Sequence, residues 1–153
     1  MRKFCYFVQW VLLCLRNKII FSTLSESEYY RERDEAFYRA YREALSRRDV
    51  RTHEDALRAA LHSHTSQHWI PPFQAYRRIL SCRKGVYPKS ERKRRLAESL
   101  YREYLQVCQV WYFKDCSTYF KAQFAVGRPA DGFYISMRTA RRIIERKRHE
   151  KTR

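Results

Sequence analysis

The sequence predicts an all-α single domain of six or seven helices, with at most two short strands. Only three Gly and four Pro occur in 153 residues, too few for the frequent turns of a β-sandwich or barrel. No Gly or Pro lies between residues 1 and 70, so the first half lacks the strongest helix breakers. The content of 44% hydrophobic and 16% aromatic residues excludes a disordered basic tail.

The N-terminal segment begins with Met1-Arg2-Lys3 and an apolar run over residues 4–15, the outline of a signal peptide. The run contains Gln9, continues into Arg16-Asn17-Lys18 and has no small-residue cleavage site. It is also shorter than the roughly 20 residues needed to span a bilayer. We therefore expect a buried first helix reaching Phe21. The alternative is a membrane-surface helix with a basic flank.

A capping box at Ser25 and Glu28 predicts the start of a helix that runs to about Arg48. Its expected apolar stripe consists of Tyr30, Phe37, Tyr41 and Leu45, and residues 31–35 form an expected solvated face of mixed charge.

The middle of the chain contains signals for three more helices. Thr52 and Asp55 cap a short helix over residues 54–62. The Pro71-Pro72 pair begins a helix that Gly85 and Pro88 terminate. Ser90 starts the longest central helix. The expected apolar residues of the last two helices are Phe73, Tyr76, Ile79 and Leu80, then Leu96, Leu100, Tyr104 and Cys108.

The last part of the chain predicts two helices. Residues 110–113 fit either a short strand or a last helical turn. Ser117 caps a helix expected to end near Ala125, with Gly127 beyond it. Ser136 caps a final helix that runs into the basic tail 145–153.

Part of the sequence repeats with an offset of 65 residues. The segment 69–75 (WIPPFQA) matches 134–140 (YISMRTA), and 77–80 matches 141–144 after a one-residue slip. The predicted organisation is an N-terminal half (1–50), a first repeat (51–88), a central linking helix (89–116) and a second repeat (117–153), all in one domain. A true duplication would give a pseudo-twofold arrangement with adjacent aromatic segments and equivalent basic helices; coincidence is the alternative.

The pattern of Trp69-Ile70 followed by Ala75 and Ile79 resembles small basic proteins of gut anaerobes and their mobile elements. No activity is attached to that resemblance, so it implies no roles for individual residues.

The net charge of +17 is concentrated in the last two-thirds of the chain. Residues 1–50 hold ten Lys/Arg and seven Asp/Glu, whereas residues 51–153 hold 23 and nine. One run lies between Tyr76 and Arg95 and the other after Ser136. A charge run is commonly only a solvated face. These runs are Arg-rich and nearly single-signed, and the guanidinium fork suits phosphate oxygens. A polyanion partner is therefore expected, nucleic acid (DNA or RNA) ahead of anionic lipid.

The candidate nucleic-acid-binding residues are basic and follow or belong to the repeated helix: Arg77, Arg78, Arg83, Lys84, Arg92, Arg94, Arg95, Arg138, Arg141, Arg142, Arg146 and Arg148. Gln74, Arg138 and Thr139 are of types that can reach base edges. The plainer interpretation of these three, helix-start residues facing solvent, is preferred.

Catalytic and metal signals are weak. His62, His64 and His68 lie in a polar loop with no nearby Cys or carboxylate to complete a metal site. Glu91-x-Lys93 and Glu145-x-Lys147 resemble the end of a nuclease motif but follow no strand. Five scattered Cys form no disulfide or zinc pattern. We expect no catalytic residue, metal or cofactor, and a reducing, cytoplasmic setting.

The resulting functional hypothesis is a non-enzymatic, helix-turn-helix-like DNA-binding accessory or regulatory protein. One alternative is an interaction subunit of a ribonucleoprotein or mobile-element complex, with a protein partner on the N-terminal helices. A second is a membrane-surface protein anchored by residues 4–21, which is less expected.

Overall fold

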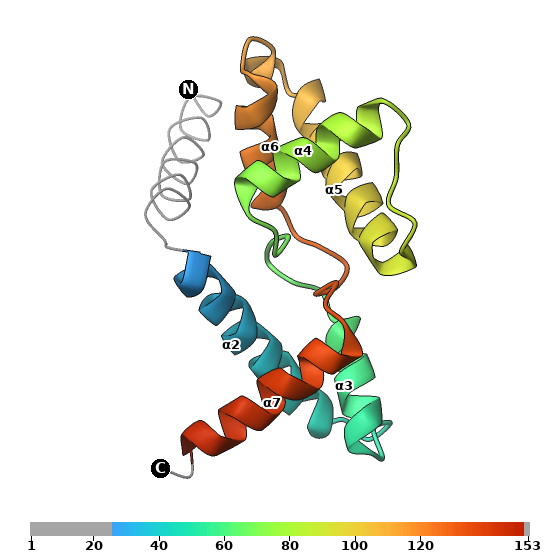
Figure 1. Cartoon of the computed structure of the whole chain (residues 1–153), viewed down its shortest axis with the longest axis vertical. Helices are drawn as coiled ribbons and strands as arrows, with labels where there is room; N and C mark the ends of the chain where they lie inside the picture. Colours follow the sequence, from blue (N-terminus) through green and yellow to red (C-terminus); the bar gives the residue numbers. More distant parts are fainter. Residues whose placement is uncertain (1–25, 152–153) are drawn as a thin grey trace, which may run out of the picture.

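The computed structural model describes residues 26–151, and every described element is helical (Figure 1). The elements are α2 (Glu26–Leu45), α3 (His53–Leu61), α4 (Pro72–Arg83), α5 (Glu91–Gln109), the 3-10 helix η1 (Trp111–Phe113), α6 (Thr118–Val126) and α7 (Met137–Lys151). The all-α prediction is confirmed. The expected first helix and the capping box at Ser25 lie outside the described residues.

The sequence signals at the helix starts have clear structural counterparts. The Thr52 hydroxyl accepts the Asp55 N–H at 3.1 Å while the Asp55 carboxylate accepts the Thr52 N–H at 3.0 Å. Ser117 and Ser136 also accept amides three residues downstream. Pro71 precedes α4 without a side-chain cap, and residues 111–113 form η1 rather than a strand. The predicted helix positions are therefore correct to within a few residues.

The helices form two lobes of one domain (Figure 1). The α2 lobe contains α2, α3 and α7, whose buried core includes Phe37, Tyr41, Ala60 and Ile144. The α5 lobe contains α4, α5 and α6, with a core that includes Ile79, Leu100, Tyr104 and Val126. The chain crosses between the lobes twice, in residues 62–71 and 127–136.

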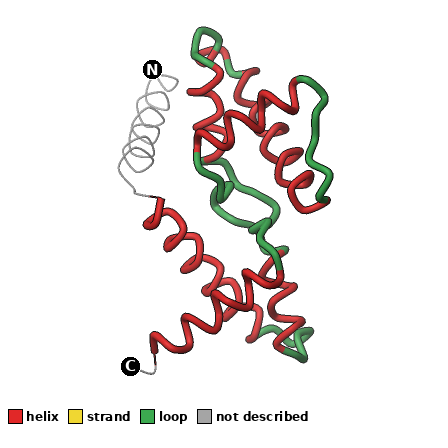
Figure 2. Tube along the Cα trace, viewed as in Figure 1, coloured by secondary structure: helices red, strands yellow, loops and turns green. Residues whose placement is uncertain are grey.

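These two connecting segments lie side by side between the lobes (Figure 2). Thr65 and Ala130 each donate an N–H to the carbonyl of the other, at 2.9 and 3.0 Å, in an isolated antiparallel bridge. On either side, His68 N–H donates to Val126 O and Phe133 N–H donates to Leu61 O, at 2.8 and 3.2 Å. In this set Leu61, Thr65 and His68 have their counterparts 65 positions later, at Val126, Ala130 and Phe133.

The same offset relates the helices. α3 and α4 begin at residues 53 and 72, and α6 and α7 begin 65 residues later, at 118 and 137. We refer to α2-α3-α4 as the first unit and α5-α6-α7 as the second. Their last helices are exchanged, because α4 packs with α5 and α6 whereas α7 packs with α2 and α3. The helix α5, in the predicted linking segment 89–116, packs with α4 and α6 as α2 packs with α7 and α3.

The buried residues of α4 and α7 align at a constant offset of 65, without the one-residue slip expected between 77–80 and 141–144. Ala75, Ile79 and Cys82 are buried in α4, and Ala140, Ile144 and Lys147 are buried 65 positions later in α7. Arg77 therefore corresponds to Arg142, whereas Arg78 corresponds to the buried Ile143.

The predicted buried faces of α2 and α5 differ from the observed ones by one residue at several positions. In α2 the buried residues are Tyr29, Phe37, Tyr41 and Ala44, whereas Leu45 is 42% exposed. Asp34, placed on the expected solvated face, is only 5% exposed. The buried stripe of α2 advances by three residues from Tyr41 to Ala44, which turns Leu45 outward.

In α5 the buried stripe includes Ala97 and Val107, and the predicted core residues Leu96 and Cys108 lie at its edges, partly buried.

The helices α3 and α4 of the first unit are not joined by the short turn of a helix-turn-helix motif. Such a motif joins its helices by a turn of about three or four residues. Here the ten residues 62–71 separate α3 from α4, and the two helices belong to different lobes. The aromatic segments are also not paired directly: the bridge lies four residues before Trp69 and Tyr134.

Candidate nucleic-acid interface

The densest positive charge lies on the α5 lobe, along α4, the loop 84–90 and the first turn of α5. We call this region the α4–α5 basic surface. The loop follows one side of the lobe from the end of α4 to the start of α5 (Figure 1). All its basic side chains are exposed except the half-buried Arg78. The set is Arg77, Arg78, Arg83, Lys84, Lys89, Arg92, Lys93, Arg94 and Arg95, against Glu91 as the only carboxylate.

None of these nine cations forms an ion pair within the described part of the chain. Arg92 donates to the carbonyl of Tyr134 at 3.2 Å. The positive charge of this surface is therefore not compensated locally, and the residues 72–126 as a whole hold 12 Lys/Arg against four Asp/Glu.

The basic residues of α7 have a different environment. Arg141 pairs with Glu54 at 2.8 Å, and Arg146 pairs with the buried carboxylate of Asp34. Lys147 is buried between Glu35 and Glu150. Arg148 donates to the Tyr41 hydroxyl at 3.3 Å. These contacts fasten α7 to α2 and α3.

Two other α7 candidates, Arg138 and Arg142, are exposed and form no ion pair among residues 26–151. The two predicted basic helices thus share a register, but only α4 keeps most of its cations available to a ligand.

The cations of α4 and α7 differ in their pairing because the long helices that face them, α5 and α2, carry different side chains. Buried positions of α2 recur 63 residues later in α5: Phe37 with Leu100, Tyr41 with Tyr104 and Ala44 with Val107. On this register Asp34 corresponds to Ala97, and Glu35 to Glu98.

On the facing helices, Arg146 and Lys147 of α7 correspond to Ser81 and Cys82 of α4. The ion pairs of the α2 lobe are therefore replaced in the α5 lobe by small side chains. The Cys82 thiol, beside the carbonyl of Ala97 at 3.9 Å, has its pKa raised by burial, with Glu98 adding to the effect.

Two hollows occupy corresponding places on the last helices. The α4 hollow, about 530 Å³, is lined by Gln74, Arg77, Arg78, Ser81 and residues 86–88. The α7 hollow, about 500 Å³, is lined by Thr139, Arg142, Ile143 and Arg146, the counterparts of the four α4 residues, and by Arg33, Asp34, Glu145 and His149. No carboxylate lines the α4 hollow. In the α7 hollow, two carboxylates offset the arginines.

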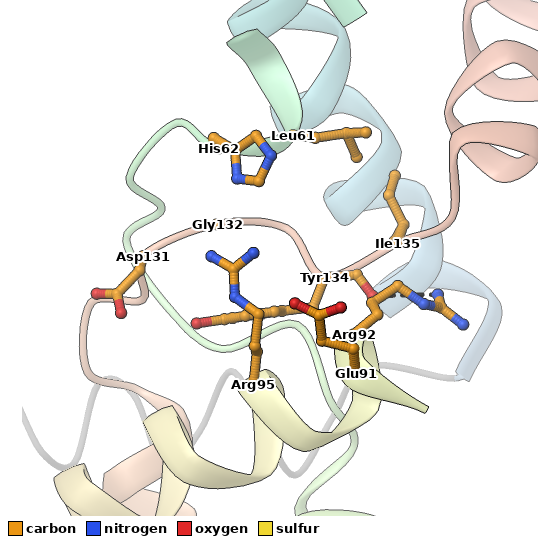
Figure 3. Close-up of a pocket in the computed structure, with 9 residues that line it drawn as sticks. All are labelled: Leu61, His62, Glu91, Arg92, Arg95, Asp131, Gly132, Tyr134 and Ile135. Atoms are coloured by element: carbon orange, nitrogen blue, oxygen red, sulfur yellow. Dashed lines mark hydrogen bonds between the residues drawn. The ribbon is translucent and has the colours of Figure 1, made fainter. Parts of the chain in front are cut away.

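A third pocket lies between the lobes, at the other end of the α4–α5 basic surface (Figure 3). Its volume is about 270 Å³. Arg95 extends its guanidinium toward His62 from below, beside the ring of Tyr134, whose φ of 52° is strained for a side chain of this size. Arg92 and Arg95 are balanced there by Glu91 and Asp131, so the pocket itself is not strongly electropositive.

The histidines of the polar loop do not come together as a metal site. His68 is fully buried and uses both ring nitrogens, because Nδ1 donates to Arg128 O at 3.1 Å and Nε2 lies 3.0 Å from the Ser99 hydroxyl. His62 and His64 are exposed. No group of three His, Cys, Asp or Glu in the described chain has metal-site geometry.

No helix in residues 26–151 combines the length and apolar character required to cross a membrane. The proposed membrane anchor, residues 4–21, lies outside the described residues. The apolar face of α2, considered for a protein partner, is occupied by α3 and α7.

Sequence reasoning missed the apolar part of the α4–α5 basic surface. Phe73, predicted as a core residue, is 60% exposed, and Val86 and Tyr87 are 59% and 37% exposed. The signal available was the spacing of Ala75, Ile79 and Cys82, which defines the buried face of α4 and leaves Phe73 off it.

No family model, no curated protein and no solved structure matches the chain.

Proposed function

We propose that this protein binds nucleic acid through the α4–α5 basic surface and performs no chemistry on it. The observation that carries the proposal is the set of nine neighbouring cations without an ion pair in the described chain. Six of the nine are arginines, whose guanidinium group binds phosphate oxygens through two parallel hydrogen bonds.

The lack of ion pairs at these nine side chains among the described residues supports a ligand-binding role over a structural one. A protein that needed the arginines only for stability would pair them, as α7 pairs Arg141 and Arg146 with carboxylates. Their concentration on one lobe costs electrostatic repulsion in the free protein. A polyanion removes that repulsion, and release of its condensed counterions adds a favourable entropy.

Salt dependence tests the proposal directly. If six to ten cations each contact a phosphate, affinity for a short duplex DNA or a structured RNA falls roughly 10³- to 10⁵-fold between 50 and 200 mM salt. The Arg94→Ala/Arg95→Ala variant weakens binding at low salt and reduces the slope of log affinity against log salt by about two, one for each lost phosphate contact.

The matched control removes the same charge from the other lobe. Arg39 and Arg42 are exposed on α2 and form no ion pair within residues 26–151, so Arg39→Ala/Arg42→Ala leaves the slope unchanged. A salt-independent affinity, or equal losses in the two double variants, contradicts the proposed surface.

We also infer that the two units are copies of one three-helix unit, related by a pseudo-twofold axis through the Thr65–Ala130 bridge. The 65-residue offset between the starts of α3 and α6 and of α4 and α7, and the reciprocal hydrogen bonds at this bridge, support the inference. In a crystal structure of the protein, superposing residues 53–83 on 118–148 should require a rotation of about 180°. A rotation far from that value contradicts it.

A further inference from the structure

The α4 hollow is more than a patch of positive charge, because apolar side chains line one side of it and Phe73 lies nearby on α4. Val86 and Tyr87 line it from the loop, and Phe73 lies one helical turn before Arg77 on α4. All three are exposed. Neither aromatic ring, Phe73 or Tyr87, packs against another ring in the described part of the chain.

The loop that carries Tyr87 is held over α4 by its backbone. Gly85 adopts φ +72° just after the end of α4, a conformation that favours glycine. The N–H groups of Lys84 and Val86 both donate to Ser81 O at 3.0 Å, and Gly85 N–H donates to Cys82 O at 2.9 Å. The position of Tyr87 beside the arginines is thus built into the helix terminus.

The chemistry of the hollow distinguishes single strands from duplexes. Arg77 and Arg78 offer guanidinium groups to phosphates, and Gln74 offers an amide that can hydrogen-bond a base edge. Exposed aromatic rings have no partner on a base-paired duplex, whose bases are stacked on one another. An unpaired base does present a free face to such rings.

We propose that the α4 hollow binds an unpaired nucleotide, so that the protein prefers single-stranded nucleic acid to a duplex. This proposal rests on the nucleic-acid-binding function proposed above and specifies the class of ligand. The hollow, about 530 Å³, lies within the usual range of small-ligand sites, about 300 to 1,000 Å³. The corresponding α7 hollow has Arg138 in place of Phe73 and carboxylates in its lining, so it lacks both features.

The test compares labelled oligo-dT and oligo-U with a duplex of matching length, by fluorescence anisotropy at fixed salt. The full-length protein binds the single strands more tightly. Phe73→Ala and Tyr87→Ala each weaken single-strand binding between about fivefold and about 100-fold, as loss of one stacked base predicts, and leave duplex binding unchanged. Tyr87→Phe, which keeps the ring, retains most of the affinity.

Leu45→Ala is the matched control, because Leu45 is an exposed apolar residue of the other lobe. It changes neither affinity. Urea unfolding checks that Phe73→Ala and Tyr87→Ala remain folded, as expected for exposed positions.

The outcomes separate the two proposals. Equal binding of strands and duplex, unaffected by Phe73→Ala and Tyr87→Ala, overturns the nucleotide site; if Arg94→Ala/Arg95→Ala still lowers the salt slope, the proposed function survives. Weaker binding of these two ring variants to anionic phospholipid vesicles, with oligonucleotide binding unchanged, assigns the hollow to a membrane and also overturns the proposal. Failure to bind any oligonucleotide at low salt removes the proposed function itself.

Discussion

The helices α4 and α7 occupy corresponding places in the two lobes, yet their arginines do different things. On α7, Arg141 and Arg146 pair with carboxylates of α3 and α2. On α4, Arg77 and Arg78 form no ion pair among the described residues. The comparison shows that a basic run becomes a binding surface or a packing device according to the helix that faces it. The predictions below probe this difference.

The largest expected effect is a loss of stability at a buried position that α4 and α7 share. Ile79 and Ile144 are buried at corresponding positions, 0% and 5% exposed. Ile79→Ala and Ile144→Ala should each lower the free energy of unfolding by about 2 to 5 kcal/mol, from lost burial and the cavity left behind. Urea denaturation measures both. A loss below about 1 kcal/mol at only one position would show that the two helices are not packed equivalently.

The next effect tests the anchoring of α7. Asp34 is buried and accepts hydrogen bonds from Arg33 and Arg146. Asp34→Asn should reduce stability by about 1.5 to 3 kcal/mol, the usual worth of hydrogen bonds to a charged group. It should also strengthen nucleic-acid binding at low salt, because Arg146 is released.

Ala97→Ser, at the position of α5 that corresponds to Asp34, is the control for the Asp34 substitution and should leave binding unchanged. Undiminished stability in Asp34→Asn would mean that α7 is held mainly by its apolar face.

A smaller effect tests the junction between the lobes. Burial lowers the pKa of His68 below its ordinary value, so the folded protein favours the neutral ring. The unfolded chain then binds the extra proton more readily, and stability present above the unfolded pKa of about 6.5 is lost as pH falls. Urea midpoints between about pH 8 and 5.5 measure this loss.

The matched variant is His68→Phe/Ser99→Ala, which introduces Phe and Ala, the residues found at the corresponding positions 133 and 36. Its stability should vary less over this pH range than that of the natural protein. An identical pH profile would show that His68 is not the titrating group.

The smallest effect concerns the exposed ion pair between Glu54 of α3 and Arg141 of α7. Glu54 and Arg141 side chains are 38% and 56% exposed, and solvent screens such pairs. The hydrogen bond from Arg141 lowers the pKa of Glu54. Glu54→Gln should nonetheless leave the urea midpoint unchanged within error. A clear shift would mean that the surface charges of α7 stabilise the fold as strongly as Asp34 does.

Local signals predicted the helices well. The Thr52, Ser117 and Ser136 caps depend on hydroxyl acceptors three residues before an amide, and such patterns are visible in sequence. The exchange of α4 and α7 between lobes depends on contacts between distant segments, which no local pattern records.

The candidate site was predicted only in part. Charge counting found Arg77 to Arg95 but treated the α7 arginines as equivalent to them. Their pairing depends on Asp34 and Glu54, which lie 112 and 87 residues away from Arg146 and Arg141. The exposure of Phe73, by contrast, could have been predicted, because the spacing of Ala75, Ile79 and Cys82 defines a buried face of α4 that excludes it.

The exchange of last helices also determines the order in which the chain can complete its cores during synthesis. The α5 lobe is continuous, from residue 72 to 126, whereas the α2 lobe combines residues 26–61 with α7, the last helix described. A nascent chain can therefore assemble α4, α5 and α6 on the ribosome while α2 and α3 still lack their third helix. Domains generally fold as units in the order of translation. Here the earlier helices must wait for the latest one, and the apolar faces of α2 and α3 lack their third helix until α7 is synthesised.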